Sequence, residues 1–303
     1  MIRKTLPKGF VPVMLTPFLE DKTVDYKGVA LLSEMYINAG AAGLFANCLL
    51  SEMYELTNDE RIQLVETVVK TANGRVPIIA TGTLEGSIEE MADFSKKLYS
   101  TGIDAIIVIN SILVKENESD ELFLEEMNRF MALTGDIPLG IYECPVPYKR
   151  LITNEILQKL LPTGRLIYHK DTSLDIEKVK GRIAIGNDYN FGLYDAYMVN
   201  AVASLKAGAM GLSCIQGNYF PELVVWLCDN FDNKNEIEKI DAVQQFFDKN
   251  MELMHTAYPI SAKYILQKRG YDIGLHTRRE VGVLTKDLKV KLDILLENYY
   301  KLQ

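Results

Sequence analysis

Short apolar stretches alternate with amphipathic stretches along most of the chain. The apolar stretches predict buried strands at residues 10–16, 43–48, 76–81, 105–110, 139–144, 166–173, 183–187 and 211–214. Apolar residues at helical spacing predict the intervening helices at residues 25–39, 59–71, 87–101, 120–134, 154–161, 176–180 and 195–207. Strand followed by helix, repeated with nearly continuous apolar strands, is typical of a parallel sheet that is covered by helices.

The number of predicted strands favours an α/β fold of the (β/α)8 TIM-barrel type, because eight strands fall within about 205 residues. A doubly wound sheet is the weaker alternative, since no G-x-G-x-x-G follows the first strand and residues 82–86 form only a loop. Helical spacing continues past the last strand, at residues 221–228, 237–258, 261–269 and 278–300. We therefore expect a barrel over residues 1–220, with a C-terminal helical extension over residues 221–303 packed on it.

Charge and composition exclude several classes of partner. The 303 residues carry a net charge of −8, which argues against nucleic acid or an anionic membrane surface. No apolar run approaches the ~20 residues that span a bilayer, and no apolar segment follows the basic N-terminus as in a signal peptide. The cysteines are far apart and the histidines lack zinc-site spacing; these residues are Cys48, Cys144, Cys214, Cys228, His169, His255 and His276. We expect a soluble, cytoplasmic protein without disulfides.

The sixth predicted strand contains a lysine in surroundings that are otherwise largely apolar. Alternation along residues 166–173 places Lys170 on the same side of the strand as Leu166 and Tyr168. Burial of an ammonium group is costly, so this lysine requires a reason. One reason is a structural ion pair with a carboxylate. The other is a pKa lowered by burial, so that the neutral amine attacks a carbonyl and forms a Schiff base.

A tyrosine on the preceding strand bears on this choice. Active sites of TIM barrels lie at the carboxyl ends of the strands. Lys170 lies near the end of the sixth predicted strand, and Tyr142 lies at the end of the fifth. A phenol beside a carbinolamine can transfer the protons that dehydration to an imine requires. The alternative is that Tyr142 is an ordinary core aromatic residue with a satisfied hydroxyl group.

Several short segments form an ordered set of motifs. They are Val-Met-Leu-Thr-Pro-Phe (13–18), Leu-Ser-Glu-Met-Tyr-Glu-Leu-Thr-Asn-Asp-Glu-Arg (50–61), Tyr-Glu-Cys-Pro (142–145), His-Lys-Asp-Thr-Ser (169–173), Gly-Asn-Asp (186–188), Gly-Ala-Met-Gly-Leu-Ser (208–213) and Pro-Ile-Ser-Ala-Lys (259–263). In this order, over roughly residues 10–275, the chain resembles the dihydrodipicolinate synthase / N-acetylneuraminate lyase superfamily of class I aldolases.

The resemblance implies the chemistry and the assembly of the protein. Lys170 would form the Schiff base with a 2-oxo acid, which is pyruvate in most members, and Tyr142 would relay protons. No metal or organic cofactor would be used. Family members are usually tetramers built as dimers of dimers, so we expect a homo-oligomer, either a tetramer or a dimer, whose only other partner is a small-molecule substrate.

The loop that binds the substrate carboxylate departs from the family pattern. The substrate-binding positions that we expect are Leu49, Leu50, Ser51 and Ser213. The first two replace a pair of threonines, and Ser51 supplies a hydroxyl group only if the loop shifts by one residue. Glu52 is kept and is expected to hold the loop. The second tyrosine and the substrate-gripping arginine of the synthase are absent.

These features together predict an enzyme. We expect a class I, Schiff-base lyase of the aldolase type, acting on carbon–carbon or carbon–oxygen bonds of a 2-oxo acid such as pyruvate or a sugar-derived keto acid. It is not expected to be a true dihydrodipicolinate synthase. One alternative, favoured by Leu49 and Leu50, is a catalytically quiet family member that binds a 2-oxo acid; assays of imine trapping and turnover separate the two. Another is a pyridoxal-phosphate barrel, which predicts yellow protein and a phosphate-binding loop near residues 211–217.

Overall fold

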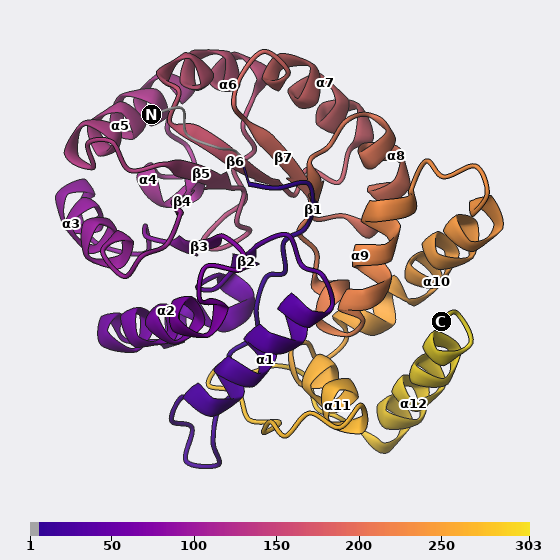
Figure 1. Cartoon of the computed structure of the whole chain (residues 1–303). Coiled ribbons are helices and arrows are strands. Elements are labelled where there is room, and N and C mark those ends of the chain that lie inside the picture. The colour runs from indigo at the N-terminus through magenta and orange to yellow at the C-terminus, as the bar shows by residue number, and fades with distance from the viewer. Residues whose placement is uncertain (1–5) are drawn as a thin grey trace.

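The strands form one closed parallel sheet. The computed structural model describes residues 6–303, and within them eight strands run in the order β1-β8-β7-β6-β5-β4-β3-β2. They are β1 (Gly9–Phe10), β2 (Leu44–Phe45), β3 (Ile78–Thr81), β4 (Ala105–Ile109), β5 (Leu139–Tyr142), β6 (Leu166–Asp171), β7 (Gly192–Asp195) and β8 (Gly211–Leu212). A bridge between Val13 and Phe45 joins the two ends of this order, and the Phe45 N–H donates to the Pro12 carbonyl over 2.9 Å. The structure confirms the predicted (β/α)8 barrel (Figure 1).

Helices surround the barrel between successive strands (Figure 1). They are α1 (Tyr26–Asn38), α2 (Asn58–Ala72), α3 (Ile88–Tyr99), α4 (Asn110–Leu113), α5 (Asp120–Leu133), α6 (Asn154–Leu160), α7 (Ile176–Gly186), α8 (Ala201–Lys206) and α9 (Pro221–Asn230). Thr57 and Ser87 start α2 and α3 as capping boxes, in which each side chain and a glutamate three residues later satisfy free backbone N–H groups. No helix in residues 6–303 is long and apolar enough to cross a membrane.

The C-terminal part of the chain is helical, as predicted. The helix α9 follows β8 and packs on β1, and three more helices lie outside it: α10 (Ile237–His255), α11 (Ile260–Lys268) and α12 (Lys286–Tyr300). The last helix begins eight residues later than the predicted start at residue 278. Arg278 instead reaches across to α2, where its guanidinium group binds the Glu60 carboxylate over 2.6 and 2.7 Å. The division of the chain at residue 220 stays a prediction.

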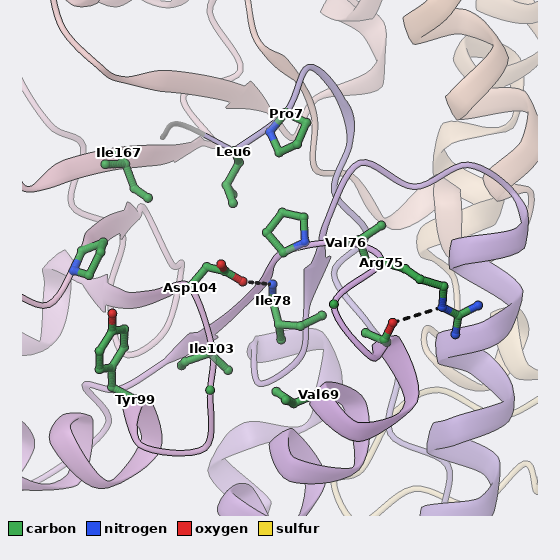
Figure 2. Close-up of a pocket in the computed structure, with 15 residues that line it drawn as sticks. Leu6, Pro7, Val69, Arg75, Val76, Ile78, Tyr99, Ile103, Asp104 and Ile167 are labelled. Atoms are coloured by element: carbon green, nitrogen blue, oxygen red, sulfur yellow. Dashed lines mark hydrogen bonds between the residues drawn. The ribbon is translucent and has the colours of Figure 1, made fainter. Parts of the chain in front are cut away.

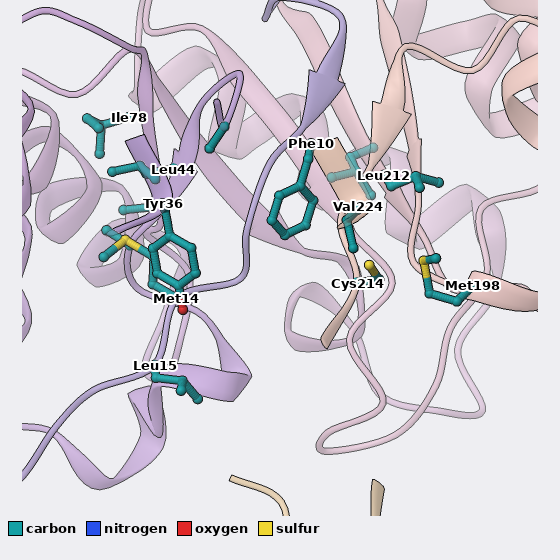
Figure 3. Packing of buried hydrophobic residues seen from close by; sticks show 14 of the residues in the cluster. Phe10, Met14, Leu15, Tyr36, Leu44, Ile78, Met198, Leu212, Cys214 and Val224 are labelled. Carbon is teal, nitrogen blue, oxygen red and sulfur yellow. The ribbon is translucent and has the colours of Figure 1, made fainter. Parts of the chain in front are cut away.

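Two apolar layers hold the barrel together. Outward-facing strand residues such as Leu44 and Leu212 pack against helical residues such as Tyr36 of α1 and Val224 of α9 (Figure 3). Inward-facing residues, among them Tyr142, form a second cluster inside the barrel. Parallel strands buried on both faces explain the nearly continuous apolar runs in the sequence.

One predicted strand, at residues 183–187, is wrong. The helix α7 continues through this stretch to Gly186, and β7 forms at Gly192–Asp195 instead. The buried residues Val179, Arg182, Ile183 and Gly186 recur at helical spacing, which the short apolar run at residues 183–185 does not reveal. The Gly-Asn-Asp motif at residues 186–188 therefore lies at the end of a helix, away from the carboxyl ends of the strands. The helix predicted at residues 195–207 is also shorter, because Asp195 ends β7.

A bulge in β6 changes the predicted alternation. Leu166 pairs with Leu139 of β5, but Tyr168 pairs with Gly140, so Ile167 is an extra residue. As a result Leu166 joins the outer layer, whereas Tyr168 belongs to the cluster inside the barrel. Beyond the bulge Lys170 shares the inward side with Tyr168, as predicted.

Charged residues occupy outward positions at the carboxyl ends of β5 and β6, in a buried space under α7. Glu143 follows β5, Asp171 ends β6, and Arg182 of α7 lies between their carboxylates. The guanidinium group contacts Glu143 at 2.8 Å and also binds Asp171 and the Ile152 carbonyl. Burial by itself raises the pKa of Glu143, but the hydrogen bond and charge of His169 and the charge of Arg182 outweigh it and lower that pKa.

The same group has the residue types of a metal site. Glu143, His169 and Asp171 place one possible ligand atom each within 4.8 Å of one another. However, Arg182 donates to both carboxylates and occupies the position at which a cation would be held. The residues present therefore fit a structural ion network and not a metal centre. This network holds together the outward faces of β5 and β6, the strands that carry Tyr142 and Lys170.

We predict that Arg182→Met lowers the free energy of unfolding by about 3–5 kcal/mol, because two buried carboxylates lose their partner. Arg75→Met is the matched control: Arg75 pairs with Glu34 on the surface, where each side chain is 42% exposed, and its loss is expected to leave the free energy of unfolding nearly unchanged. Urea denaturation of both variants measures the difference. Equal losses would contradict a stabilising role for the buried network.

Candidate active site

Lys170 and Tyr142 lie side by side at the carboxyl end of the barrel. They are register partners on β6 and β5, and the Lys170 Nζ is 4.1 Å from the centroid of the Tyr142 ring. Their exposed fractions are 4% and 3%. The two residues that the sequence identified from separate strands are thus in direct contact, inside the barrel and at the end where TIM-barrel active sites form.

The Lys170 amine forms no ion pair with a carboxylate of residues 6–303. No carboxylate oxygen in that range lies within 4.0 Å of the Nζ, so the interpretation of Lys170 as a structural ion pair is wrong. The charge of Glu143 raises the pKa of the amine from a greater distance, and the thiols of Cys48, Cys144 and Cys214 are the other groups that act on it. Burial raises the pKa of each of these thiols, which keeps them neutral. Desolvation therefore dominates and lowers the pKa of Lys170, which favours the neutral and nucleophilic amine.

The Tyr142 phenol remains protonated in this setting. Burial raises its pKa well above the ordinary value. The edge of its ring meets Phe45 of β2, with the ring centroids 6.0 Å apart and the planes at 77°. Cys144, two residues further along the chain, belongs to the same buried cluster as the Tyr142 ring. A protonated phenol beside an amine whose pKa is lowered can donate a proton during imine formation.

The loop after β2 places leucines beside this pair. Leu49 and Leu50 lie in a single 3₁₀ turn, η1 (Leu49–Ser51), and both are half-buried against the cluster that contains Tyr142 and Cys144. Neither side chain can donate a hydrogen bond to a carboxylate. An apolar wall therefore stands at the position where the family pattern has hydroxyl groups.

Ser51 does not compensate for the leucines. Its hydroxyl accepts from the Cys48 N–H over 2.6 Å and donates to the Cys48 carbonyl over 2.8 Å, and the side chain is completely buried. Thr16 donates to the Ser51 carbonyl over 2.7 Å and holds the turn in place. The hydroxyl group of Ser51 is thus occupied within its own loop.

Ser213, the remaining predicted binding residue, is engaged inside the barrel. It follows β8, accepts a hydrogen bond from the Tyr168 hydroxyl over 3.0 Å and donates to the Val11 carbonyl over 2.8 Å. The Tyr168 ring stacks on Tyr194 of β7, with centroids 4.7 Å apart. The hydrogen-bond partners of Ser213 are therefore Tyr168 and Val11, and not the Lys170 amine.

Glu52 holds the loop that follows β2, as the sequence suggested, and fastens it to the C-terminal region. Its backbone is left-handed, with a φ of 57°, and its carboxylate accepts from the N–H groups of Arg278 and Arg279 over 2.8 and 3.1 Å. Lys263 of α11 lies 3.7 Å from the same carboxylate and donates to the His276 carbonyl over 2.6 Å. The segment before α12 is thereby fastened across the loop that follows β2.

Lys263 is a second buried lysine whose role was missed from sequence. Burial lowers its pKa to about 8. The signal was present, since Lys263 ends the last of the motifs and the residues that follow it, Tyr264–Leu266, are largely apolar. Unlike Lys170, it has both a carboxylate and a carbonyl within reach. These contacts suit a lysine that fastens two segments together.

A hollow of about 690 Å³ lies at the opposite end of the barrel (Figure 2). It is lined by residues that precede the strands, including Pro7, Pro77 and Asp104, whose carboxylate accepts from the Ile78 N–H over 2.8 Å. The amino ends of parallel strands lie together, so this hollow is separated from Lys170 by the barrel interior. It is not part of the candidate active site.

Comparison with known proteins agrees with this geometry. The sequence model of the "Dihydrodipicolinate synthetase family" matches residues 6–299. The chain is 25% identical over 297 residues to a 4-hydroxy-tetrahydrodipicolinate synthase of Clostridium novyi (strain NT), covering 98% of each protein. It is 24% identical over 261 residues to the enzyme of the same name from Oceanobacillus iheyensis, covering 86% of this chain and 87% of the relative.

Solved structures show the same fold. One neighbour is YagE, a prophage protein of the dihydrodipicolinic acid synthase family from E. coli K12 in complex with pyruvate; it has a TM-score of 0.86 and 22% identity, and the match covers 98% of this chain and 99% of YagE. Another is a monomeric dihydrodipicolinate synthase variant, with a TM-score of 0.88, 18% identity and 98% of each chain covered. From the match of the family model over nearly the whole sequence, we conclude that the chain belongs to the dihydrodipicolinate synthetase family.

Proposed function

We propose that this protein is a lyase of the class I aldolase type, in which Lys170 forms a Schiff base with a 2-oxo acid. Family membership supports the aldolase-type lyase. The observation that carries the proposal is a buried lysine that forms no ion pair with a carboxylate of residues 6–303, and whose amine lies 4.1 Å from the ring centroid of a protonated tyrosine. The pyruvate complex of YagE, a neighbour in fold, supports a 2-oxo acid as the class of substrate.

The chemistry follows from the two side chains. The neutral Lys170 amine adds to the carbonyl carbon of the 2-oxo acid and forms a carbinolamine. Tyr142 donates a proton to the carbinolamine hydroxyl, which leaves as water while the C=N bond forms. The protonated imine then withdraws electrons from the adjacent carbon–carbon bond, which is the step that a class I lyase uses. The family match favours this chemistry over a pyridoxal-phosphate barrel.

A second candidate is a catalytically quiet member that binds a 2-oxo acid. Leu49 and Leu50 favour it, because they remove hydroxyl donors from the mouth of the barrel, and Ser51 does not restore one. Binding without turnover, with Lys170 still able to form an imine, would establish this alternative.

The expected assembly and location are parts of the same proposal. A homo-oligomer would cover apolar surface such as Val290 and Ile294 of α12, which are 58% and 50% exposed. Cytoplasmic location rests on the sequence-based expectation. Sedimentation of the purified protein measures the assembly directly.

We predict that borohydride, added with a panel of 2-oxo acids, leaves a covalent mass adduct on the peptide that contains Lys170. Lys170→Arg should abolish the adduct while the protein stays folded, because arginine remains charged and cannot add to a carbonyl. Peptide mass mapping distinguishes Lys170 from Lys263, the other buried lysine with a lowered pKa. An adduct on Lys263, or none with any acid of the panel, would refute the assignment.

We predict negligible dihydrodipicolinate synthase activity and a preference for a bulkier or more apolar 2-oxo compound than pyruvate. A carboxylate that loses one charge-assisted hydrogen bond is destabilised by ~1.5–3 kcal/mol. The double variant Leu49→Thr/Leu50→Thr should therefore bind pyruvate roughly 10–150-fold more tightly than the wild type. Leu49→Ala/Leu50→Ala is the matched control, because it opens the pocket without adding a hydroxyl group.

Calorimetric titration with pyruvate and a coupled synthase assay check this prediction. Wild-type synthase turnover in the ordinary enzymic range of roughly 1–10³ s⁻¹ would overturn it. Weaker pyruvate binding by the threonine variant, or equal gains in the threonine and alanine variants, would show that the missing hydroxyl groups are not the cause.

A further inference from the structure

The buried ion network under α7 has a third carboxylate beside it. Asp195 ends β7 and is the register partner of Asp171 on β6. Leu193 packs in the outer layer and Tyr194 in the inner cluster, so alternation turns the Asp195 side chain to the outward face, where Asp171 also lies. Neighbouring strands are roughly 4.8 Å apart, so the two carboxylates are neighbours.

Asp195 is buried without a cation. Its exposed fraction is 1%. One carboxylate oxygen accepts from the Tyr197 N–H over 2.8 Å, whereas the other has no hydrogen-bond partner among residues 6–303. In the same range no nitrogen of a lysine, arginine or histidine side chain lies within 4.0 Å of this carboxylate. A bare charged oxygen in a buried space is costly, and a proton on it removes the charge.

The charged groups around Asp195 do not compensate for it. The titratable and polar groups that face it from the packed elements are Glu143 after β5, His169 and Asp171 of β6, Arg182 of α7, Ser204 of α8 and Cys214 after β8. Arg182 pairs with Glu143 and Asp171. The His169 Nε2 lies 3.5 Å from the Glu143 carboxylate. Three buried carboxylates therefore share one guanidinium group.

We propose that Asp195 is the proton-binding group of a pH-sensitive ion network, which stabilises the strand that carries Lys170. In the acid form the Asp195 carboxyl group is neutral, and Arg182 faces only two charged carboxylates. As the pH rises, the O–H bond of this carboxyl group breaks and the proton passes to solvent. A third negative charge then lies beside Asp171, and no electron is exchanged.

The direction of the titration agrees with this geometry. Burial is the main cause that raises the pKa of Asp195 to about 7, and the charges of Asp171 and Glu143 add to it; the Tyr197 N–H and the Ser204 hydroxyl group lower it by less. This pKa lies above the ordinary value of 3.8, so the folded chain binds the proton more tightly than the unfolded chain. The resulting stability is present in full below pH 3.8 and is lost as the pH rises through about 7.

The network adjoins both residues of the candidate active site. Asp171 directly follows Lys170, and Glu143 directly follows Tyr142. The Glu143 carboxylate also accepts from the Thr172 N–H over 2.9 Å, so it fastens the chain on the far side of Lys170. The inference does not rest on the proposed Schiff-base function, because proton binding by Asp195 is measured without substrate.

The first test counts the protons that are released when the protein unfolds in urea at about pH 6. The wild type should release roughly one proton more than Asp195→Asn, because only the folded chain holds that proton at this pH. His169→Phe should keep the proton, and so should the control Asp293→Asn, whose carboxylate pairs with Lys268 on the surface over 3.3 Å. Equal release by the wild type and Asp195→Asn, or loss of the proton in His169→Phe, would overturn the proposal.

The second test observes the carboxyl group in the folded protein. The infrared C=O stretching band of a protonated carboxyl group should be present in the wild type at about pH 6. It should fade as the pH rises through about 7, and Asp195→Asn should lack it. If that variant does not fold, Asp195→Ser replaces it, because the new hydroxyl group can accept from the Tyr197 N–H. A folded wild type without this band would refute the assignment of a proton to Asp195.

The third test is the pH dependence of stability. Between about pH 5 and about pH 8 the urea midpoint of the wild type should fall by more than that of Asp195→Asn. Midpoints that change in parallel would show that Asp195 does not make the network sensitive to pH.

Discussion

The desolvation of one amine controls the chemistry that this barrel can perform. Lys170 is buried among neutral thiols and an aromatic ring, and within residues 6–303 no carboxylate lies within 4.0 Å of its Nζ. A carboxylate at that distance would stabilise the ammonium form and suppress nucleophilicity. The absence of a counter-ion is therefore what makes the lysine suitable for imine chemistry, and the rest of the site either preserves this setting or uses it.

The fold keeps the acidic side chains and the Lys170 amine apart, because they lie on opposite faces of the strands. Inward positions of β5 and β6 carry Tyr142 and Lys170, whereas the adjacent outward positions carry Glu143 and Asp171. Arg182 pairs with both carboxylates on the outer side. The two strands thus direct the acidic groups away from the lysine, and the charge of Glu143 raises the pKa of Lys170 by less than desolvation lowers it.

The barrel and the neighbouring positions of Lys170 and Tyr142 could be predicted from the sequence, because apolar strands, helical spacing and the ends of adjacent strands are local signals. Prediction failed where tertiary contacts decide the outcome. The stretch at residues 183–187 is helical up to Gly186 because it continues the buried face of α7. The Ser51 hydroxyl forms its hydrogen bond with Cys48 of its own loop, and the spacing of residues in the sequence does not predict this. The ion pair between the buried Lys263 and Glu52 joins segments that are far apart in the chain.

The central claim is that burial makes the Lys170 amine neutral more readily than an ordinary lysine. The most direct measurement is an NMR titration of the protein labelled with ¹³C at the lysine side-chain carbon next to the amine. Loss of one signal in Lys170→Arg identifies that residue and distinguishes it from Lys263. We expect the Lys170 signal to titrate below the ordinary lysine pKa of 10.5. Titration at or above that value would contradict the account.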